Sequence, residues 1–374
     1  MGSAGAASLG AGGRAAFGST ADSTDPAVVR MHGDGLALSA AEYAAGLARL
    51  AANGSIETDD YSIGGSVETL ERQVAELLGK ERAVFLPTGT LANQLAVRRL
   101  AGEGGRVLLQ EESHLYNDSG DCLPILSRLQ AVPLAPGEAT FTLEQVRDEV
   151  ERAAGGRVST PVRALSIESP VRRLWGRVFD FAEMRRIADF ARERGIGMHL
   201  DGARVLLAEP YTGVSPVQYA ALFDTVYVSL WKYFNAASGA VLAGSAELLD
   251  DLFHVRRMFG GSLPGGWVYA APASHYLPGF AERFAEAVRR SEEVYRLLGG
   301  WTGFEVERIA GGTNVARLAV RGVDAEAWRK RLVGSAIDLP APLSGESAFK
   351  IQVNESWLAQ SPETIAEAMI RAAS

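Results

Sequence analysis

The central part of the chain alternates short apolar runs with longer amphipathic stretches, and this alternation constrains the fold more than any other feature. Six apolar runs are typical of buried strands: residues 83–86, 107–109, 164–167, 197–200, 225–230 and 239–243. Most of the segments between them carry apolar residues at helical spacing, as in 90–100, 143–153 and 182–194. Strands that alternate with helices predict an α/β fold, with a mostly parallel sheet covered by helices on both faces.

The pattern changes after about residue 277. A long helical stretch at 282–298 is followed by a strand, a helix, a strand and a helix, at residues 314–320, 325–332, 349–353 and 362–373. We therefore expect a large domain over residues 26–277, including an N-terminal arm, and a smaller α+β domain over residues 278–374. Residues 1–25 consist largely of Gly, Ala and Ser, which predicts a flexible leader.

Capping signals help to place the first helices. Ser39 is a good N-cap, and Glu42 three residues later completes a capping box before an apolar pattern that ends near residue 52. A second amphipathic stretch at 66–78 ends at Gly79, a residue type that commonly terminates helices.

Composition excludes several classes of protein. The net charge is −8 at pH 7, which disfavours a nucleic-acid partner, and no run of 18 apolar residues predicts a membrane span. The single cysteine, Cys122, excludes an intrachain disulfide and a cysteine metal cage. The histidines never lie four residues apart, so a HExxH zinc site is excluded and no metal is expected. We expect a cytoplasmic protein, with export after trimming of the leader as the alternative.

Chemically distinctive side chains follow the predicted strands. In open α/β sheets, ligands bind beyond the carboxyl ends of the strands. Those ends carry an anion-binding helix start, a flat ring, two carboxylates and an amine: Thr88 to Thr90, His114, Glu168, Asp201 and Lys232. Each has an ordinary explanation, such as a helix cap or a solvated lysine. Together they match pyridoxal phosphate, which needs a phosphate site, a stacking partner, a carboxylate at its ring nitrogen and an amine for its aldehyde.

Five segments resemble the fold-type I pyridoxal-phosphate enzymes, and within them the threonine aldolase and β-eliminating lyase group. They are PTGTLANQ (87–94), ESHLY (112–116), HLDGAR (199–204), SLWK (229–232) and RRMFGGS (256–262). The most specific is HLDGAR, whose Asp201 lies 31 residues before Lys232. The resemblance runs from about residue 59 to the C-terminus and implies a large domain like that of aspartate aminotransferase.

The resemblance implies pyridoxal 5′-phosphate as the cofactor and three catalytic residues. Lys232 would condense with the cofactor aldehyde and shuttle protons, Asp201 would pair with the pyridine nitrogen, and His114 would stack on the ring. The other implied cofactor contacts are Thr88, Gly89, Thr90 and Ser229 at the phosphate and Arg204 at the ring oxygen.

The resemblance also implies contacts to an amino acid substrate. Arg204 would bind the substrate carboxylate with its guanidinium fork. Lys350 occupies the position of a family arginine with the same role, and it keeps the charge without the bidentate geometry. Tyr61 lies in a segment that, in the family, reaches the partner subunit's active site, although the family glycine after it is Ser62 here. Arg257 would border the cofactor, and Glu168 would be mainly structural.

Two further departures concern the substrate side. Pro264 replaces an arginine usual in the GGSLPGGW stretch, and residues 156–162 contain no second histidine to act on a β-hydroxyl proton. The cofactor side therefore matches the family more closely than the substrate side does.

The resemblance implies a carbon–carbon lyase that cleaves β-hydroxy-α-amino acids into glycine and an aldehyde, as low-specificity threonine aldolases do. Two alternatives remain: the same cofactor with β-elimination, racemisation or transamination, and a non-catalytic binding protein. A nicotinamide dehydrogenase is disfavoured because no GxGxxG opens the first strand–helix turn. Because the family's active site lies between subunits, a homodimer or homotetramer is expected.

Overall fold

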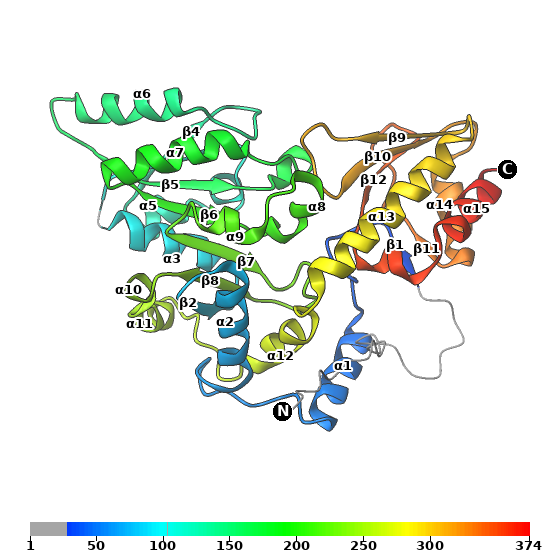
Figure 1. Ribbon diagram of the computed structural model, residues 1–374, viewed down its shortest axis with the longest axis horizontal. Helices are drawn as coiled ribbons and strands as arrows, with labels where there is room; N and C mark the ends of the chain where they lie inside the picture. The colour runs from blue at the N-terminus through cyan, green and yellow to red at the C-terminus, as the bar shows by residue number, and fades with distance from the viewer. Residues whose placement is uncertain (1–27, 103) are drawn as a thin grey trace, which may run out of the picture.

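The computed structural model describes residues 28–102 and 104–374 (Figure 1). The leader expected at residues 1–25 lies outside these described residues. Two layered regions are visible, one around a large central sheet and one around a smaller sheet near the C-terminus.

The central sheet has seven strands in the order β2-β8-β7-β6-β5-β3-β4. Their bounds are β2 (Arg82–Leu86), β8 (Ala240–Gly244), β7 (Thr225–Ser229), β6 (Gly197–Asp201), β5 (Val162–Glu168), β3 (Arg106–Gln110) and β4 (Gln130–Leu134). All neighbours pair in parallel except β8, which runs antiparallel to both β2 and β7. The predicted α/β fold with a mostly parallel sheet is therefore confirmed.

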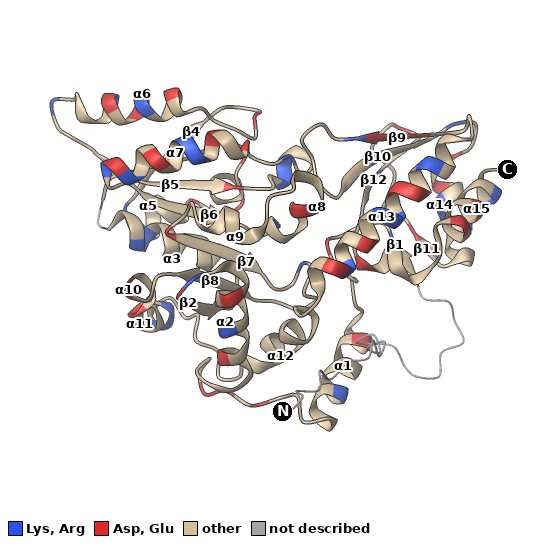
Figure 2. Cartoon of the chain, viewed as in Figure 1, with Lys and Arg blue, Asp and Glu red and all other residues tan. Residues whose placement is uncertain are grey.

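Both faces of this sheet are buried. Successive side chains of each strand point to opposite sides, and each side packs against helices. In β3, Val107 and Leu109 pack with α3 (Gly89–Ala101) and α5 (Cys122–Ser127), whereas Leu108 joins the main core on the other face. The helices α2 (Gly65–Leu78), α6 (Leu143–Ala154) and α7 (Phe181–Arg194) contribute to that core. Figure 2 shows acidic and basic side chains interspersed along the outer helices α6 and α7, as expected for amphipathic helices.

The predicted helix boundaries at the N-terminal side are confirmed. The helix α1 (Ala40–Ala52) begins with a capping box in which Ser39 and Glu42 each accept the other's backbone N–H. The helix α2 ends at Gly79, which adopts the left-handed conformation with φ of 62°.

Strand β4 was not expected from the sequence. It lies at the edge of the sheet, where its residues are partly exposed and its apolar run is interrupted by Pro133. Proline is tolerated at an edge because one side of the strand needs no ladder hydrogen bond.

The C-terminal region is built on a three-stranded antiparallel sheet in the order β12-β10-β9. Its elements are α13 (Phe280–Gly299), β9 (Phe304–Arg308), β10 (Val315–Val320), α14 (Ala325–Leu332), β12 (Ala348–Gln352) and α15 (Pro362–Ala373). The N-terminal strand β1 (Val29–Arg30) pairs in parallel with β11 (Ile337–Asp338), so the start of the described chain runs along this region. From there it continues past the carboxyl ends of the central strands to α1.

Short helices fill the remaining connections: α4 (His114–Asn117), α8 (Glu209–Thr212), α9 (Pro216–Ala220), α10 (Ala246–Leu249), α11 (Leu252–Met258) and α12 (Trp267–Tyr276). None of the helices in the described part of the chain has the length and hydropathy needed to span a membrane.

Candidate active site

A cavity of about 410 Å³ lies at the carboxyl ends of the parallel strands. It is lined by eight of the residues singled out in the sequence: Thr88, Gly89, Thr90, His114, Glu168, Asp201, Arg204 and Lys232. Tyr227 also lines it. The structure therefore brings together groups that come from four different strand ends and one helix start.

Lys232 supplies the amine of this cavity. It follows the end of β7, and its Nζ donates a hydrogen bond of 3.2 Å to Ser229 Oγ. The lysine is only 8% exposed, and burial, followed by the nearby Arg204 cation, lowers its pKa to about 8. Near neutral pH a much larger fraction of this amine is uncharged than for a solvated lysine.

Asp201 ends strand β6 and is buried, with both carboxylate oxygens held by the protein. The side-chain amide of Asn93, on α3, donates to Asp201 Oδ2 at 2.5 Å. The backbone N–H of Ala203 donates to Oδ1 at 3.1 Å. These two hydrogen bonds fix the orientation of the carboxyl group.

The Asn93 amide is itself held by a buried histidine. His199 Nε2 lies 2.9 Å from Asn93 Oδ1, and His199 Nδ1 lies 2.9 Å from Thr225 Oγ1. Since the Asn93 nitrogen donates to Asp201, its oxygen must accept from Nε2–H, which leaves Nδ1 to accept from the Thr225 hydroxyl. Burial lowers the pKa of His199 to about 4, so the ring is neutral at physiological pH.

Asn93 and His199 were not predicted as site residues, although they lie in the segments 87–94 and 199–204 that resemble the family. The sequence contains a signal for each. His199 precedes Asp201 by two residues in the same strand, so both side chains point to the same face of the sheet. Asn93 lies one helical turn after Gly89, on the helix whose start lines the cavity.

His114 and Glu168 are joined across the cavity wall. The backbone N–H of His114 donates to Glu168 Oε2 at 2.6 Å, and that of Arg172 donates to Oε1 at 2.9 Å. Burial, and then the neighbouring Asp201 charge, raise the pKa of Glu168. Burial lowers the pKa of His114 below its usual value, so its imidazole is mainly neutral at pH 7. Both carboxylate oxygens of Glu168 therefore accept hydrogen bonds from the backbone.

The helix start at Thr88 to Thr90 has a specific requirement for glycine. Thr88 is the N-cap, and its hydroxyl oxygen accepts from Leu91 N–H at 3.2 Å. A Cβ on Gly89 would lie 2.0 Å from the hydroxyl oxygen of Tyr227, a buried residue of β7. Any larger residue would therefore displace either Tyr227 or the start of the helix. The sequence offered no signal for the part played by Tyr227.

Arg204 is fixed by a carboxylate that sequence reasoning also missed. Its Nε donates to Asp34 Oδ2 at 2.9 Å, and the Asp34 side chain is only 6% exposed. Asp34 Oδ1 accepts from Gln352 Nε2 at 3.2 Å, which ties the N-terminal segment to β12. Among the described residues none bonds the two Nη groups of Arg204, which leaves that edge of the guanidinium for a carboxylate.

Two expected substrate contacts, Lys350 and Tyr61, do not line this cavity in the single chain. Lys350 Nζ lies 4.9 Å from the ring centroid of Trp175. Burial, and then the neighbouring Arg204 and Arg172 cations, lower its pKa, so Lys350 belongs to the same cationic surroundings as Arg204.

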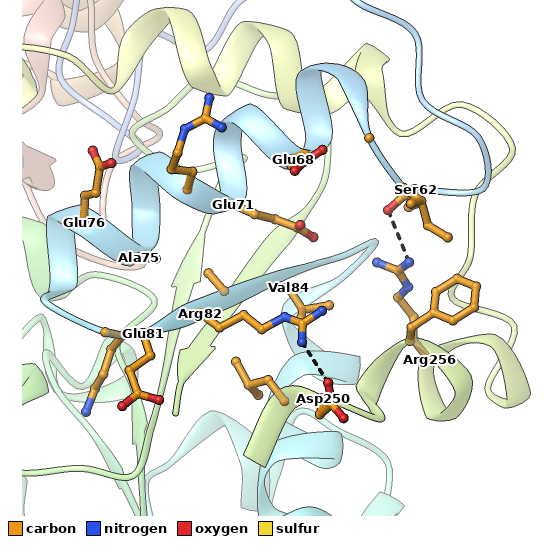
Figure 3. Close-up of a pocket in the computed structure, with 17 residues that line it drawn as sticks. Ser62, Glu68, Glu71, Ala75, Glu76, Glu81, Arg82, Val84, Asp250 and Arg256 are labelled. Atoms are coloured by element: carbon orange, nitrogen blue, oxygen red, sulfur yellow. Dashed lines mark hydrogen bonds and ion pairs between the residues drawn. The ribbon is translucent and has the colours of Figure 1, made fainter. Parts of the chain in front are cut away.

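Tyr61 is 42% exposed and lies on a turn held by two arginines. The guanidinium of Arg257 lies 4.7 Å from its ring centroid, and Arg256 Nη2 donates to Ser62 O at 3.3 Å (Figure 3). Ser62 replaces the family glycine and adopts a positive φ of 64°. Ser62 Oγ donates to Leu263 O and accepts from Leu263 N–H, each at 3.2 Å, in the same stretch that contains Pro264. These two hydrogen bonds stabilise the turn in this conformation.

A larger cavity, of about 750 Å³, lies beside this turn between α2, β2 and α11 (Figure 3). Its charged side chains largely interact with one another or with the backbone: Arg82 pairs with Asp250 at 3.2 Å, and Arg256 donates to Phe85 O at 2.6 Å. It lacks the convergent strand ends of the smaller cavity, which we therefore take as the candidate active site.

Comparison with known proteins identifies the family. A family model for beta-eliminating lyases matches residues 43–320 of this chain. The chain belongs to the beta-eliminating lyase family. The family expected from the sequence motifs is thereby confirmed.

Curated relatives of this beta-eliminating lyase family member have more than one activity. Low specificity L-threonine aldolase from Saccharomyces cerevisiae is 33% identical over 208 residues, which cover 54% of this chain and 53% of the yeast protein. Alanine racemase TOXG from Cochliobolus carbonum is 30% identical over 208 residues, covering 55% of this chain and 53% of that protein. The chain thus spans about half the length of these curated relatives.

Solved structures of similar proteins agree with the fold. A crystal structure from Listeria monocytogenes, described as that of a candidate L-allo-threonine aldolase, has a TM-score of 0.71 and 28% sequence identity. The alignment covers 85% of this chain and 88% of that one.

The cavity residues of this beta-eliminating lyase family member fit pyridoxal phosphate, the cofactor indicated by the family. The start of α3, kept open by Gly89, offers N–H groups to a phosphate. Asp201 offers an oriented carboxylate to a ring nitrogen, and Lys232 offers an amine with a lowered pKa to an aldehyde.

Proposed function

We propose that the protein is a pyridoxal-phosphate-dependent carbon–carbon lyase that cleaves β-hydroxy-α-amino acids into glycine and an aldehyde. The observation that carries this proposal is the single cavity shared by the Lys232 amine, the Asp201 carboxylate and the His114 ring. The family to which the chain belongs and its threonine aldolase relatives support the same reaction. One of these relatives, from Escherichia coli, is 27% identical over 229 residues.

When bound, pyridoxal phosphate stabilises negative charge at the substrate α-carbon by delocalising it into the ring. Asp201 would serve this by keeping the ring nitrogen protonated, and Asn93 and Ala203 N–H hold its oxygens in place. His114 would pack against the ring, and Lys232 would provide the uncharged amine for the aldehyde. Thr88, Gly89 and Thr90 would hold the phosphate, with Ser229 orienting Lys232 Nζ.

Cleavage requires a base for the β-hydroxyl proton. As that proton leaves, the Cα–Cβ bond breaks, the hydroxyl carbon becomes the aldehyde carbonyl, and the electron pair stays on Cα until Cα is protonated. We assign the base to His114, which lines the cavity and whose lowered pKa leaves it neutral at pH 7. Lys232 accepts this proton from His114 and passes it to Cα to complete glycine.

The substrate carboxylate is assigned to Arg204 and Lys350. Asp34 holds Arg204 by its Nε, and Lys350 lies close enough to Arg204 for the two cations to influence each other. This grip sets which bond of Cα stands perpendicular to the ring, and therefore which bond breaks.

Racemisation is a second candidate because the alanine racemase TOXG is 30% identical over 208 residues. The same cavity would then remove and return the α-proton, with Lys232 as the base. The two candidates differ in products and not in the cofactor.

An amino acid panel with product identification tests the proposal. Purified protein supplied with pyridoxal phosphate should convert threonine or phenylserine into glycine and the matching aldehyde, and Lys232→Ala should abolish this. Interconversion of L- and D-alanine without aldehyde would favour racemisation. Ammonia or a keto acid would favour elimination or transamination. A yellow protein that turns over no amino acid would favour a binding function.

We also propose that the active protein is a cytoplasmic homodimer or homotetramer. The exposure of Tyr61, and its position outside the cavity of its own chain, support a role at a partner subunit's site. Analytical ultracentrifugation that finds only monomers would contradict this assembly, and cell fractionation tests the compartment.

A further inference from the structure

A second cavity, of about 580 Å³, adjoins the candidate active site. The two cavities share three lining residues, Arg204, Trp231 and Lys232. A ligand bound at the Lys232 amine and the Arg204 guanidinium therefore has this second space directly beside it.

Trp231 stands at the junction of the two cavities. The centroid of its ring lies 4.7 Å from Lys232 Nζ, yet the residue is 54% exposed. In an amino acid, Cβ lies two bonds, about 2.5 Å, from the amino nitrogen. A substituent on Cβ of an amino acid held at the Lys232 position is thus within reach of the indole.

The remaining wall of the second cavity is mostly apolar. It includes Leu38, just before α1, and Leu47 within α1, together with Ala236 and Ala237 after Lys232. The cavity can therefore accept a hydrophobic group of substantial size.

The polar side chains in this wall already have partners within the protein. Tyr43 Oη donates to Val268 O at 2.6 Å, and Asn235 Oδ1 accepts from Leu36 N–H at 2.7 Å. Gln352 Oε1 accepts from Gly33 N–H at 2.9 Å. A polar substituent entering this space would lose its hydrogen bonds to water without gaining hydrogen bonds to these side chains. An apolar substituent would bury apolar surface, which is favourable.

We propose that the second cavity receives the β-substituent of the substrate, and that Trp231 selects aryl over small alkyl groups there. The inference rests on the proposed function and narrows its substrate class to β-aryl-β-hydroxy-α-amino acids. The aryl ring stacks on the indole of Trp231, and its outer edge packs against the α1 side of the cavity.

The ratio of kcat/KM for phenylserine to that for threonine tests this selection. The wild-type ratio should be about ten or more, and Trp231→Ala should lower it about tenfold, as loss of an aromatic pair and its buried area predicts. Trp301→Ala is the matched control, because Trp301 is 51% exposed and lies outside both cavities. That variant should keep the wild-type ratio.

A second variant and a binding measurement separate selection from damage beside Lys232. Ala44→Trp fills the cavity from α1 and should also lower the ratio. Phenylalanine and alanine lack the β-hydroxyl, so the visible absorbance change of the holoenzyme reports their binding without cleavage. Phenylalanine should bind more tightly than alanine to the wild type, and this preference should disappear in Trp231→Ala.

Equal ratios in the wild type and Trp231→Ala, or a wild-type preference for threonine, would overturn the inference. A change of oligomeric state in Trp231→Ala would overturn it as well, because the surface would then belong to an interface between copies. If neither hydroxy amino acid is cleaved, the proposed function fails, and the comparison of phenylalanine with alanine still decides what Trp231 selects.

Discussion

The side-chain amide of Asn93 donates to the carboxylate of Asp201 at 2.5 Å, although 108 residues separate them. This bond joins α3, whose first turn lines the candidate active site, to β6, which carries the carboxylate. The positions of the anion cradle and of the carboxylate are therefore coupled through one helix. His199 and Thr225 extend the coupling to the neighbouring strand β7.

Replacing Asn93 by alanine should disturb both stability and chemistry. It leaves His199 without an acceptor and frees one oxygen of Asp201, so we expect a loss of about 1–3 kcal/mol in the free energy of unfolding. We also expect kcat to fall about tenfold or more, equivalent to about 1.4 kcal/mol of transition-state stabilisation. Denaturant unfolding and steady-state kinetics measure the two effects.

Gln94→Ala is the matched control for this prediction. Gln94 is also buried on α3, but its amide donates to Ser127 Oγ at 3.3 Å and not to Asp201. It should lose stability while kcat and the pH dependence of the visible absorbance stay close to wild type. Equal losses of kcat in both variants would show that Asn93 acts only through stability.

The lowered pKa of Lys232 predicts how cofactor uptake depends on pH. Only the uncharged amine attacks an aldehyde, so the rate of pyridoxal phosphate incorporation should rise with pH and level off above about 8. Arg204→Gln removes a cation that disfavours the ammonium form of Lys232, so it should raise the pKa of Lys232 and move the rate profile to higher pH. A wild-type rate still rising near pH 10, about the pKa of an ordinary lysine, would contradict the prediction.

Buried His199 should make the protein sensitive to mild acid. Its pKa is about 4 in the folded protein and 6.5 as the ordinary value. Between these values the unfolded chain binds a proton that the folded one does not, so stability is lost as pH falls from 6.5 toward 4. Across this range the free energy of unfolding should fall by about 3 kcal/mol. Unfolding free energies measured across this range test it.

His199→Asn removes the titrating group. The variant should be less stable at pH 7 but should lose less stability on acidification than the wild type. Replacement of exposed His254 by asparagine is the matched control, because this histidine lies outside the buried hydrogen bonds to Asn93 and Thr225. Identical slopes for wild type and His199→Asn would contradict the assignment of a buried neutral imidazole.

Gly89→Ala should weaken cofactor binding. The added Cβ would lie 2.0 Å from Tyr227 Oη, and the buried tyrosine has little room to withdraw. We expect the dissociation constant for pyridoxal phosphate to rise about tenfold or more, with partial recovery in the double variant that also carries Tyr227→Ala. Gly299→Ala has open space around its Cβ and should bind the cofactor as wild type does. Unchanged affinity in Gly89→Ala would refute the steric argument.

In the central sheet, the strands that sequence patterns predicted are those buried on both faces, where apolar runs are continuous. Strands β4 and β9 escaped because they have partly exposed residues and give no such run. Helices were predictable where a cap or a terminal glycine marks an end, as at Ser39 and Gly79. Periodicity and capping are local signals, so they work where local sequence decides the structure.

In the candidate site, too, only the residues with a local sequence signal were predictable. Residues at strand ends, such as Asp201 and Lys232, could be anticipated because parallel strands deliver their ends to one edge. The partners that fix them could not. Asp34 meets Arg204 across 170 residues of sequence, and Tyr227 meets Gly89 only through the packing of β7 against α3. Such contacts depend on tertiary packing.

The proposed lyase activity requires a covalent bond between the amine at position 232 and pyridoxal phosphate. The chain has four lysines, at positions 80, 232, 330 and 350, so peptide mapping after borohydride reduction of the loaded protein identifies the modified one without ambiguity. We predict one phosphopyridoxyl group per chain, on Lys232. A colourless protein without the label, or a label found on Lys80, Lys330 or Lys350, would contradict it.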